Sequence, residues 1–390
     1  MVIGDGAYIK KINRGLILQK IIEYGFISRA DLSKITGLNK ATISVQVADL
    51  LEEKLVRETR HEHNTVGRRP IMLSINGDAG YVLGIDLDYE DIKYRISDLQ
   101  GKLIETKTTK LDTGDYEEIV QLLIKQIKKY DDKYADCHYG LVQTIIGMHG
   151  TVNNDKSILF VPRFQWRNID IKADIERVLD VNISIENTAN LSVFAERVHK
   201  HHQSSNLLSI VLRSGIGAGI MNNDKLVKGH DGYAGEIGHM IISPFGKVCK
   251  CGNHGCWELY AAEPVVFSNL NEKLDRPNLT YQDLKQLIAE KDPTTCEEMK
   301  TFINYVSIGL NNMINSYNPE TIVLNSELLQ LYPNAIEEIE GNLHSSVSVY
   351  RNIVLSELGG NASVQGACAL AIRNFLKVRE VTFKEVENQH

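Results

Sequence analysis

Residues 239–256, HMIISPFGKVCKCGNHGC, concentrate the side chains of this chain that are best suited to bind a metal. Three of its six cysteines, Cys249, Cys251 and Cys256, fall within eight residues, and His239 lies ten positions before the first of them. Such a group can be a disulfide cluster, a redox centre, a catalytic metal site or a structural metal site. Each of these implies a different protein.

The spacing of these residues, H-x9-C-x-C-x4-C, matches a structural zinc site. One imidazole and three thiolates fill the tetrahedral shell of Zn2+, whereas a catalytic zinc keeps one position for water. Gly252 and Gly255 permit the sharp turns that aim the thiolates inward. We therefore predict a structural Zn2+, and the alternative is a buried cluster of reduced thiols without metal. The predicted ligands are His239, Cys249, Cys251 and Cys256.

Composition places the chain among cytosolic globular proteins. Its 390 residues are too many for one ordinary domain, so two or three domains are expected. The chain has no uncharged apolar run of about 18 residues, and its first residues, MVIGDGAYIKKINRG, lack the apolar core of a signal peptide. We expect a cytoplasmic protein without a membrane span. In a reducing cytosol, clustered cysteines bind metal more often than they form disulfides.

The charge of the chain is unevenly distributed. Residues 1–75 hold twelve Lys and Arg against eight Asp and Glu, a net charge of +4, although the whole chain carries −7. A small basic head in front of an acidic body suggests that the head meets a polyanion.

The pattern of residues 28–56, SRADLSKITGLNKATISVQVADLLEEKLV, predicts two helices around a tight turn at Gly37. Ser28 is the expected cap of the first helix, which would bury Leu32 and Ile35. The second helix is expected from about residue 39 to residue 54. In a helix-turn-helix the start of this helix faces base edges in the major groove. The polar residues predicted to read DNA there are Asn39, Lys40, Thr42, Ser44 and Gln46.

A basic hairpin follows the two helices. Two strands, Leu55–Thr59 and Ile71–Ile75, are expected around a polar loop that carries Arg68 and Arg69, which suit phosphates or a narrow minor groove. Helices followed by a basic wing favour a winged helix-turn-helix DNA-binding domain over residues 1–77. The alternative is a plain helical hairpin.

The rest of the chain has the alternating pattern of an α/β protein. Strands are expected at Tyr81–Leu87, Ile92–Ser97 and Leu103–Lys110, and a helix at Tyr116–Tyr134. A second round of strand, turn and strand begins near residue 207. This repetition predicts two related lobes, and a ligand is expected in the cleft between them.

Residues 217–266, GAGIMNNDKLVKGHDGYAGEIGHMIISPFGKVCKCGNHGCWELYAAEPVV, resemble the signature region of the ROK family of repressors, open reading frames and sugar kinases. The resemblance implies an actin/hexokinase-like fold of two lobes. The first lobe would span 78–195 plus about 365–380, and the second, 196–364, would carry the zinc site. With a winged helix in front, the chain is most similar to the xylose repressor type of this family.

That resemblance implies a sugar-responsive transcriptional repressor of a carbohydrate operon, with xylose as the expected sugar. Its partners would be operator DNA, a small sugar effector and further copies of itself, as a homodimer or homotetramer. Family sugar contacts carry over to Gly150, Asn187, Glu236, His239 and Glu258. The exact sugar, whether it induces or co-represses, the operator sequence and the need for a protein partner stay open.

Three departures from the kinase pattern of the family argue against an enzyme. The D-x-G-G-T motif, whose glycines admit ATP phosphates, reads DLDYE at residues 86–90, and these carboxylates would repel a triphosphate. The second phosphate loop, G-T-G-x-G, reads RSGIG at 213–217. Thr188 replaces the aspartate that acts as the base, and a hydroxyl has no useful basicity near neutral pH.

We therefore expect no catalytic residues. The alternative is a ROK sugar kinase of the gluco-, fructo- or N-acylhexosamine type with a regulatory DNA-binding head. Outside these motifs, Glu186 and Glu196 are interpreted as charges at a strand end and on a helix surface.

Overall fold

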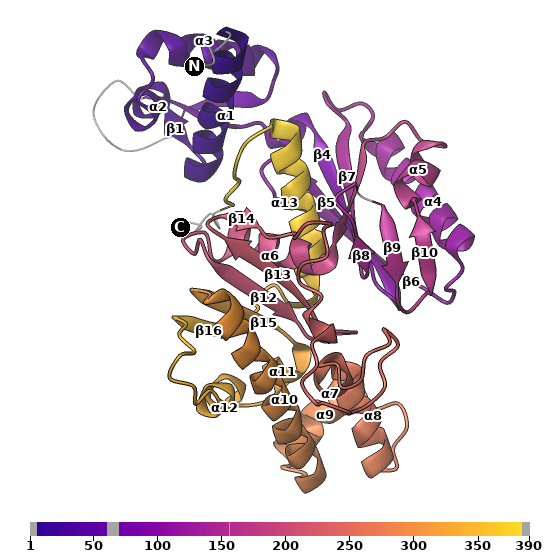
Figure 1. Cartoon of the computed structure of the whole chain (residues 1–390). Helices are drawn as coiled ribbons and strands as arrows, with labels where there is room; N and C mark the ends of the chain where they lie inside the picture. The colour runs from indigo at the N-terminus through magenta and orange to yellow at the C-terminus, as the bar shows by residue number, and fades with distance from the viewer. Residues whose placement is uncertain (1–5, 61–69, 156, 384–390) are drawn as a thin grey trace.

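The computed structural model describes residues 6–60, 70–155 and 157–383. It consists of a small N-terminal head and two larger lobes, arranged one after another in Figure 1. No helix within the described ranges is both long and apolar enough to span a membrane.

The head contains three helices and a small sheet with strand order β1-β3-β2. Ser28 Oγ accepts from the Asp31 N–H and caps α2, and Gly37 ends α2 with a φ of 71°. The predicted helix-turn-helix and its cap are therefore present. Ile35 contradicts its prediction, because this side chain is 39% exposed and Leu32 alone of α2 is buried. The elements are α1 (Gly6–Tyr24), β1 (Ile27–Ser28), α2 (Arg29–Thr36), α3 (Lys40–Glu52), β2 (Val56–Arg60) and β3 (Ile71–Ile75).

The first lobe is built on a five-stranded sheet with strand order β11-β7-β4-β5-β6. Strands β4, β5 and β6 form an antiparallel meander, and β7 and β11 add in parallel to β4. The sheet strands are β4 (Tyr81–Leu87), β5 (Asp91–Asp98), β6 (Leu103–Lys110), β7 (Leu141–Met148) and β11 (Ile183–Asn187). A small side sheet contains β8 (Thr151–Val152), β9 (Ile158–Val161) and β10 (Trp166–Ile169).

The second lobe repeats this topology, with strand order β14-β13-β12-β15-β16. Its strands β12, β13 and β14 again form a meander, and β15 and β16 again run parallel to the first strand. The predicted duplication of the lobes is therefore present. The strands are β12 (Leu207–Val211), β13 (Gly217–Asn222), β14 (Lys225–Leu226), β15 (Thr321–Asn325) and β16 (Asn352–Leu355).

Each sheet is covered by helices on its outer face. In the first lobe α4 (Tyr116–Tyr134) and α5 (Ile171–Glu176) pack against the sheet, and their buried side chains share one apolar core with the strands. In the second lobe, the core joins β12 and β15 to a group of helices. These helices are α7 (Glu258–Ala261), α8 (Glu263–Lys273), α9 (Tyr281–Ala289), α10 (Pro293–Tyr317), α11 (Glu327–Leu331) and α12 (Ala335–Asn342).

Two helices, α6 (Thr188–His199) and α13 (Ala362–Leu376), cross between the inner faces of the sheets. Helix α6 follows the last strand of the first sheet but packs on β12 and β13, whereas α13 follows the second sheet and packs on β4 and β7. The predicted lobe boundary at residue 195 therefore falls inside a helix that both lobes share.

Glycines bring these layers into close contact. A Cβ on Gly366 of α13 would lie 1.9 Å from the Leu191 backbone oxygen of α6, and one on Gly219 of β13 would lie 2.3 Å from the Ala189 oxygen. On the first-lobe side, a Cβ on Gly84 of β4 would lie 2.5 Å from the Val364 oxygen. No larger residue fits at these positions without moving backbone.

The head is joined to the first lobe and to α13 by a continuous apolar core. Buried residues of α1 to α3, such as Ile17 and Leu50, belong to the same cluster as Ile372 and Leu376 of α13. A polar contact supports this junction, because Tyr139 Oη donates to the Glu53 oxygen at the end of α3 at 2.7 Å. Helix α13 and the head therefore share one apolar core.

Glu196 of α6 lies in the interior of the crossing, contrary to its interpretation as a surface charge. Its side chain is fully buried, and one carboxyl oxygen accepts from Ser356 Oγ beyond β16. Burial raises the pKa of Glu196 to about 7 from its ordinary value of 4.5, because the ionised carboxylate loses hydration. Sequence spacing missed this burial because it depends on the contact of α6 with the second lobe.

The α6–α13 contact predicts the effect of enlarging Gly366. Gly366→Val should lower the free energy of unfolding by about 1–3 kcal/mol or more, because the new side chain collides with backbone. Thermal unfolding of the full chain measures this. Gly341→Ala in α12 is the matched control, since a Cβ there meets nothing within 4 Å and should leave the melting temperature equal or higher. Equal behaviour of the two variants would contradict the close contact.

The buried carboxyl predicts a pH-dependent stability. Between pH 4.5 and about 7 the unfolded chain ionises Glu196 while the folded chain keeps it neutral, so stability is lost as the pH rises through this range. Glu196→Gln removes this loss, worth about 3 kcal/mol at the pKa difference given. The melting temperature of the variant should exceed that of the wild type at pH 8 and match it near pH 5. Glu117→Gln, at an exposed position of α4, is the control and should show no such crossover.

Candidate metal centre and ligand site

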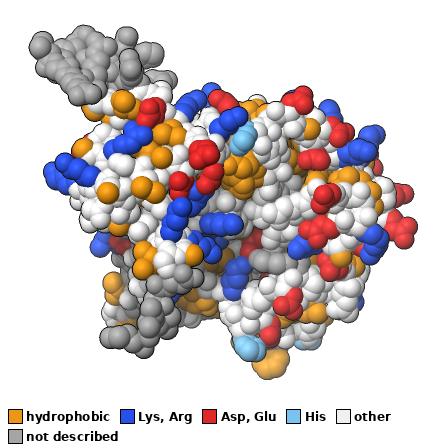
Figure 2. Space-filling model, turned by 90° about the horizontal axis from the view of Figure 1, so that it is seen from above, with side chains coloured by type: hydrophobic (Ala, Val, Ile, Leu, Met, Phe, Trp, Pro, Cys, Tyr) orange, Lys and Arg blue, Asp and Glu red, His pale blue; other side chains and the backbone are white. Residues whose placement is uncertain are grey.

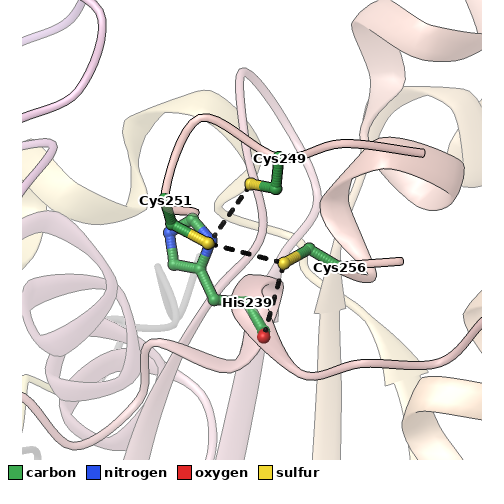
Figure 3. A group of neighbouring side chains, drawn as sticks. All are labelled: His239, Cys249, Cys251 and Cys256. Atoms are coloured by element: carbon green, nitrogen blue, oxygen red, sulfur yellow. Dashed lines mark hydrogen bonds between the residues drawn. The ribbon is translucent and has the colours of Figure 1, made fainter. Parts of the chain in front are cut away.

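The predicted metal ligands come together in the second lobe (Figure 3). One ligand atom from each of His239, Cys249, Cys251 and Cys256 lies within 4.8 Å of the others. Cys249 and Cys256 are buried, His239 is half-buried and Cys251 is exposed. His239 ends the short helix η2 (Ile237–His239), and the three cysteines lie on the loop that follows.

The distances fit a tetrahedral ion. Cys251 Sγ and Cys256 Sγ lie 3.6 Å apart, and Cys249 Sγ lies 3.7 Å from His239 Nδ1. With Zn–S near 2.3 Å and Zn–N near 2.0 Å, the S–S and S–N edges of the tetrahedron measure about 3.8 Å and about 3.5 Å. Burial raises the pKa of the Cys249 and Cys256 thiols. Raised pKa values favour neutral thiols when no metal is bound, whereas a donor set of three sulfurs and one imidazole suits a soft or borderline metal, which would bind the sulfurs as thiolates.

The local fold of the loop explains how the cysteines are aimed. Gly252 and Gly255 have φ values of 101° and 80°, so both turns use the left-handed conformation that glycine adopts most easily. A Cβ on Gly255 would lie 1.8 Å from the Ser243 backbone oxygen. Trp257, directly after Cys256, is fully buried and donates from Nε1 to the Tyr305 oxygen of α10 at 2.8 Å. The cysteine loop is thus anchored to the helical core.

Glu258 joins the metal group to the predicted sugar site. It is the first residue of α7, and its Oε1 lies 3.3 Å from His239 Nδ1 and 3.2 Å from Cys249 Sγ. Because His239 Nδ1 faces this group, Nε2 is the ring nitrogen left to interact elsewhere. The other carboxylate oxygen, Oε2, lies 3.6 Å from the Cβ position of Gly215 in the altered phosphate loop.

Asn187 and Gly150 lie together at the carboxyl ends of the first-lobe strands. Asn187 ends β11, and its Nδ2 donates to the Gly150 oxygen at 3.0 Å. Its Oδ1 accepts from the N–H groups of Ala189 and Asn190 and caps α6, a role absent from the sequence analysis. A Cβ on Gly150 would lie 2.5 Å from the Phe160 oxygen, so the site requires glycine.

Glu236 lies near His239 and Glu258. Its carboxylate is open to solvent, yet desolvation by the surrounding protein raises its pKa, an effect that His239 opposes and Glu258 reinforces. The preceding Gly235 packs so closely on β13 that a Cβ would lie 2.1 Å from the Ala218 oxygen. Strand β13 also packs on α6, whose first turn is capped by Asn187. The structure therefore gathers the sugar-contact candidates around β13 and α6.

A first-lobe tyrosine faces the same acidic group. Burial raises the pKa of Tyr89, and the carboxylates of Asp88, Glu258 and Glu236 raise it further, while Arg163 lowers it. Tyr89 lies in the β4–β5 turn, whereas Glu236 and Glu258 belong to the second lobe. The candidate ligand site is therefore formed from both lobes.

His149 is a site residue that sequence reasoning missed. Its Nδ1 lies 3.3 Å from Thr188 Oγ1, and its Nε2 lies 3.7 Å from Asp88 and 3.9 Å from Asp86. These four residues follow or end neighbouring parallel strands, where ligand sites of α/β sheets form. The position of His149 directly before Gly150 was the available signal. An imidazole and two carboxylates thus occupy the region of the altered phosphate motif.

The predicted DNA-contacting residues of helix α3 differ in their exposure to solvent. Lys40 and Ser44 are exposed and Thr42 is half-buried, while Asn39 uses its Oδ1 to cap the helix by accepting from the Thr42 N–H. Gln46 was predicted wrongly, since it is only 5% exposed.

The reason for this burial is helical spacing, because Gln46 lies three residues after the buried Ile43 and thus faces the core. Val45, which was not predicted, is 57% exposed on the opposite face of α3. Arg68 and Arg69 lie outside the described residues.

The head, the repeated five-stranded lobes and the cysteine loop define a class of proteins. The sequence profile of the ROK family matches residues 82–374, and the chain belongs to this family.

Individual relatives narrow the comparison. The chain is 35% identical over 383 residues to the xylose repressor of Bacillus subtilis (strain 168), with 96% of this chain and 99% of that protein covered. In structure it is similar to a ROK family transcriptional regulator described as a homolog of the E. coli MLC protein, with a TM-score of 0.80, 24% identity and coverage of 94% and 96%. A ROK family glucokinase from Streptomyces griseus, in complex with glucose and AMPPNP, aligns with a TM-score of 0.66 and 20% identity over 75% of this chain and 99% of its own.

The geometry of the metal group predicts the effect of removing one thiol. Cys251→Ser should lower the transition-metal content of the purified protein from about one ion per chain to well below half, because a hydroxyl is a poor substitute for a thiolate. Plasma mass spectrometry measures the bound metal. Cys296→Ser, in α10 outside the group, is the control and should retain the full content. Equal metal content in the two variants would contradict the site.

Proposed function

We propose that this chain is a sugar-responsive transcriptional repressor that acts in the cytoplasm on an operon for carbohydrate use, with xylose as its sugar. The end-to-end similarity to a xylose repressor, at 35% identity and including the head, is the observation that carries this proposal. The head with its helix-turn-helix supports it independently.

In this proposal the head binds operator DNA through the first turns of α3. Lys40 and Ser44 project from the exposed face for phosphate and base contacts, and Thr42 lies beside them. Val45 adds an apolar group suited to a thymine methyl. Arg68 and Arg69 would extend the contact from the wing of a winged helix. Two heads related by a dimer axis, or by a tetramer built from such dimers, would match a palindromic operator.

The sugar would bind between the lobes. Asn187 and the Gly150 turn would approach it from the first lobe, and Glu236, His239 and Glu258 from the second. Carboxylates and an amide accept from and donate to vicinal hydroxyl groups, and such sites reject analogues that lack those groups. His149 would contribute an imidazole at the same position.

The metal would be a structural Zn2+. Its proposed ligands, one imidazole and three cysteines, leave no coordination position for substrate. His239 is itself a proposed metal ligand, and Glu258 contacts both His239 and Cys249. The ion would therefore hold both side chains in their sugar-facing positions.

Phosphoryl transfer is the second candidate, because the chain shares its two-lobe fold with ROK glucokinase. Several side chains oppose it. Thr188 contacts His149 and offers no base, and the carboxylates of Asp86 and Asp88 lie where the family places a phosphate loop. A coupled ADP-release assay with xylose, glucose and N-acetylglucosamine tests this candidate, and turnover of any of them would establish it.

Sugar binding would reach DNA through α13. This helix packs on the first-lobe sheet and on α6, and its carboxyl end shares a core with the head. A sugar that draws the lobes together would shift α13 and respace the two heads of a dimer. Such coupling requires that the sugar bind the DNA-bound and free states with unequal affinity.

The proposal predicts that a site variant separates DNA binding from sugar response. Xylose should release the full-length protein from labelled operator DNA, followed by fluorescence anisotropy. Glu236→Gln should bind the operator as the wild type does but require at least about tenfold more xylose for release, since it loses an ionic acceptor.

Glu272→Gln, an exposed position of α8, is the control and should respond as the wild type does. Release of Glu236→Gln at the wild-type xylose concentration would refute the assignment of Glu236. Failure of every pentose and hexose to release the wild type would refute the sugar response itself.

A further inference from the structure

A cavity of about 340 Å3 lies beside the crossing of α6 and α13. Its walls come from α6, the β13–β14 hairpin, α13 and the segment 379–382. Within the described part of the chain, none of the predicted sugar or metal ligands lines it. Its volume falls in the range of small-molecule sites. It is therefore a second pocket, separate from the site between the lobes.

Most of the wall is apolar. Leu191, Phe194 and Val198 contribute one side from α6, and Leu226 and Leu370 contribute the facing sides. These side chains come from both lobes, because Leu226 belongs to the second-lobe sheet and Leu370 to the helix that covers the first. An occupant would thus exchange water for apolar contacts over most of its surface.

Positive charge exceeds negative charge around the cavity. Five basic residues line it against three acidic ones, and basic side chains also gather near the middle of the face seen in Figure 2. Lys228 is paired with Glu186, and Arg197 with Asp224 at 3.0 Å. Arg373 differs from these two, since its guanidinium makes no hydrogen bond or ion pair with residues 6–60, 70–155 or 157–383.

Arg373 is nevertheless held in place. Its guanidinium carbon lies 4.9 Å from the centre of the Phe194 ring, and both residues line the cavity. An arginine stacked on an aromatic ring presents its N–H groups at a defined orientation, which suits a carboxylate or a phosphate. Loss of hydration by burial lowers the pKa of Arg373, and the nearby carboxylate of Glu186 opposes this effect.

A second polar group in the wall also lacks a partner. Asn190 is 3% exposed, and its Nδ2 donates to Glu186 at 3.1 Å, but its Oδ1 accepts no hydrogen bond from the described residues. The buried Nε of Arg197 is likewise unsatisfied. Buried polar atoms without partners are costly, so a ligand that supplies a donor to Asn190 Oδ1 would remove this cost.

We propose that this cavity binds a small organic anion with an apolar body and a hydroxyl group. Its carboxylate or phosphate pairs with the Arg373 guanidinium, its hydroxyl donates to Asn190 Oδ1, and its body lies on Phe194 and the surrounding aliphatic wall. The binding site goes beyond the proposed repressor function and does not depend on it.

The location of the site gives the anion a means to act. It would contact α6, which packs on the second-lobe sheet, and α13, which packs on the first. Val381, in the cavity wall, belongs to the same apolar cluster as the core of the head. An anion in this cavity would therefore stabilise one relative arrangement of the lobes and the head.

Isothermal titration calorimetry on the full chain tests the proposal. The probes are 3-hydroxyhexanoate for the carboxylate and hexyl phosphate for the phosphate, with 1,3-hexanediol as the uncharged counterpart. At least one anion should bind with a Kd below about 1 mM, and the diol at least about tenfold more weakly, because it cannot pair with Arg373. The stronger of the two anions identifies the acidic group that the cavity prefers.

Variants assign the binding to the cavity. Arg373→Gln should weaken the better anion at least about tenfold, and Leu226→Trp, which fills the cavity without changing charge, should weaken it by a similar factor. Arg351→Gln, an exposed arginine of the second lobe, is the control and should bind as the wild type does. Thermal unfolding confirms that each variant is folded. The proposal is overturned if neither anion binds, or if the diol binds with the same affinity as the better anion. It is also overturned if both cavity variants bind that anion as tightly as the wild type does.

Discussion

The close contact between α6 and α13 is the constraint on which the rest of the structure depends. Gly366 lets the two helix backbones approach, and Gly219 and Gly84 let each helix settle on its sheet. The candidate ligand residues of the first lobe lie at the ends of β4, β7 and β11, and those of the second lobe lie near β13. The relative position of all of them is therefore determined by helices that contain none of the candidate metal ligands.

Two kinds of interaction hold the candidate site. The second-lobe part depends on the cysteine loop, which Trp257 anchors in the helical core. The first-lobe part depends on backbone capping, since Asn187 both ends a strand and begins a helix. A ligand that contacts both parts would therefore depend on the distance between the cysteine loop and the start of α6.

Local sequence patterns predicted the helices and strands well where the periodic spacing of hydrophobic residues alone determines which side chains are buried. The strand Tyr81–Leu87 and the helix Tyr116–Tyr134 have the expected bounds, and Ser28 and Gly37 cap α2 as expected. Patterns failed where a distant segment decides exposure. Ile35 is exposed because none of the described segments covers that side of the short α2, and Glu196 is buried because the second lobe closes over it.

The site divides in the same way. The candidate metal group could be predicted because its cysteines are close in the sequence. Their spacing suits either a structural metal site or a cluster of reduced thiols. The sugar contacts came from family resemblance and not from spacing. The sequence indicated His149 only through its position directly before Gly150, since its contacts with Thr188 and Asp88 arise from three strands that lie far apart along the chain.

The exchange of helices between the lobes has a consequence for biosynthesis. The inner face of the first-lobe sheet is covered by α13, which the ribosome makes after every strand of both sheets. Until then this face, and the apolar surface of the head that shares its core, stay open to water or to a chaperone. The two lobes therefore complete their folding together and late. The head is synthesised first, but it packs against α13 only after the rest of the chain has been made.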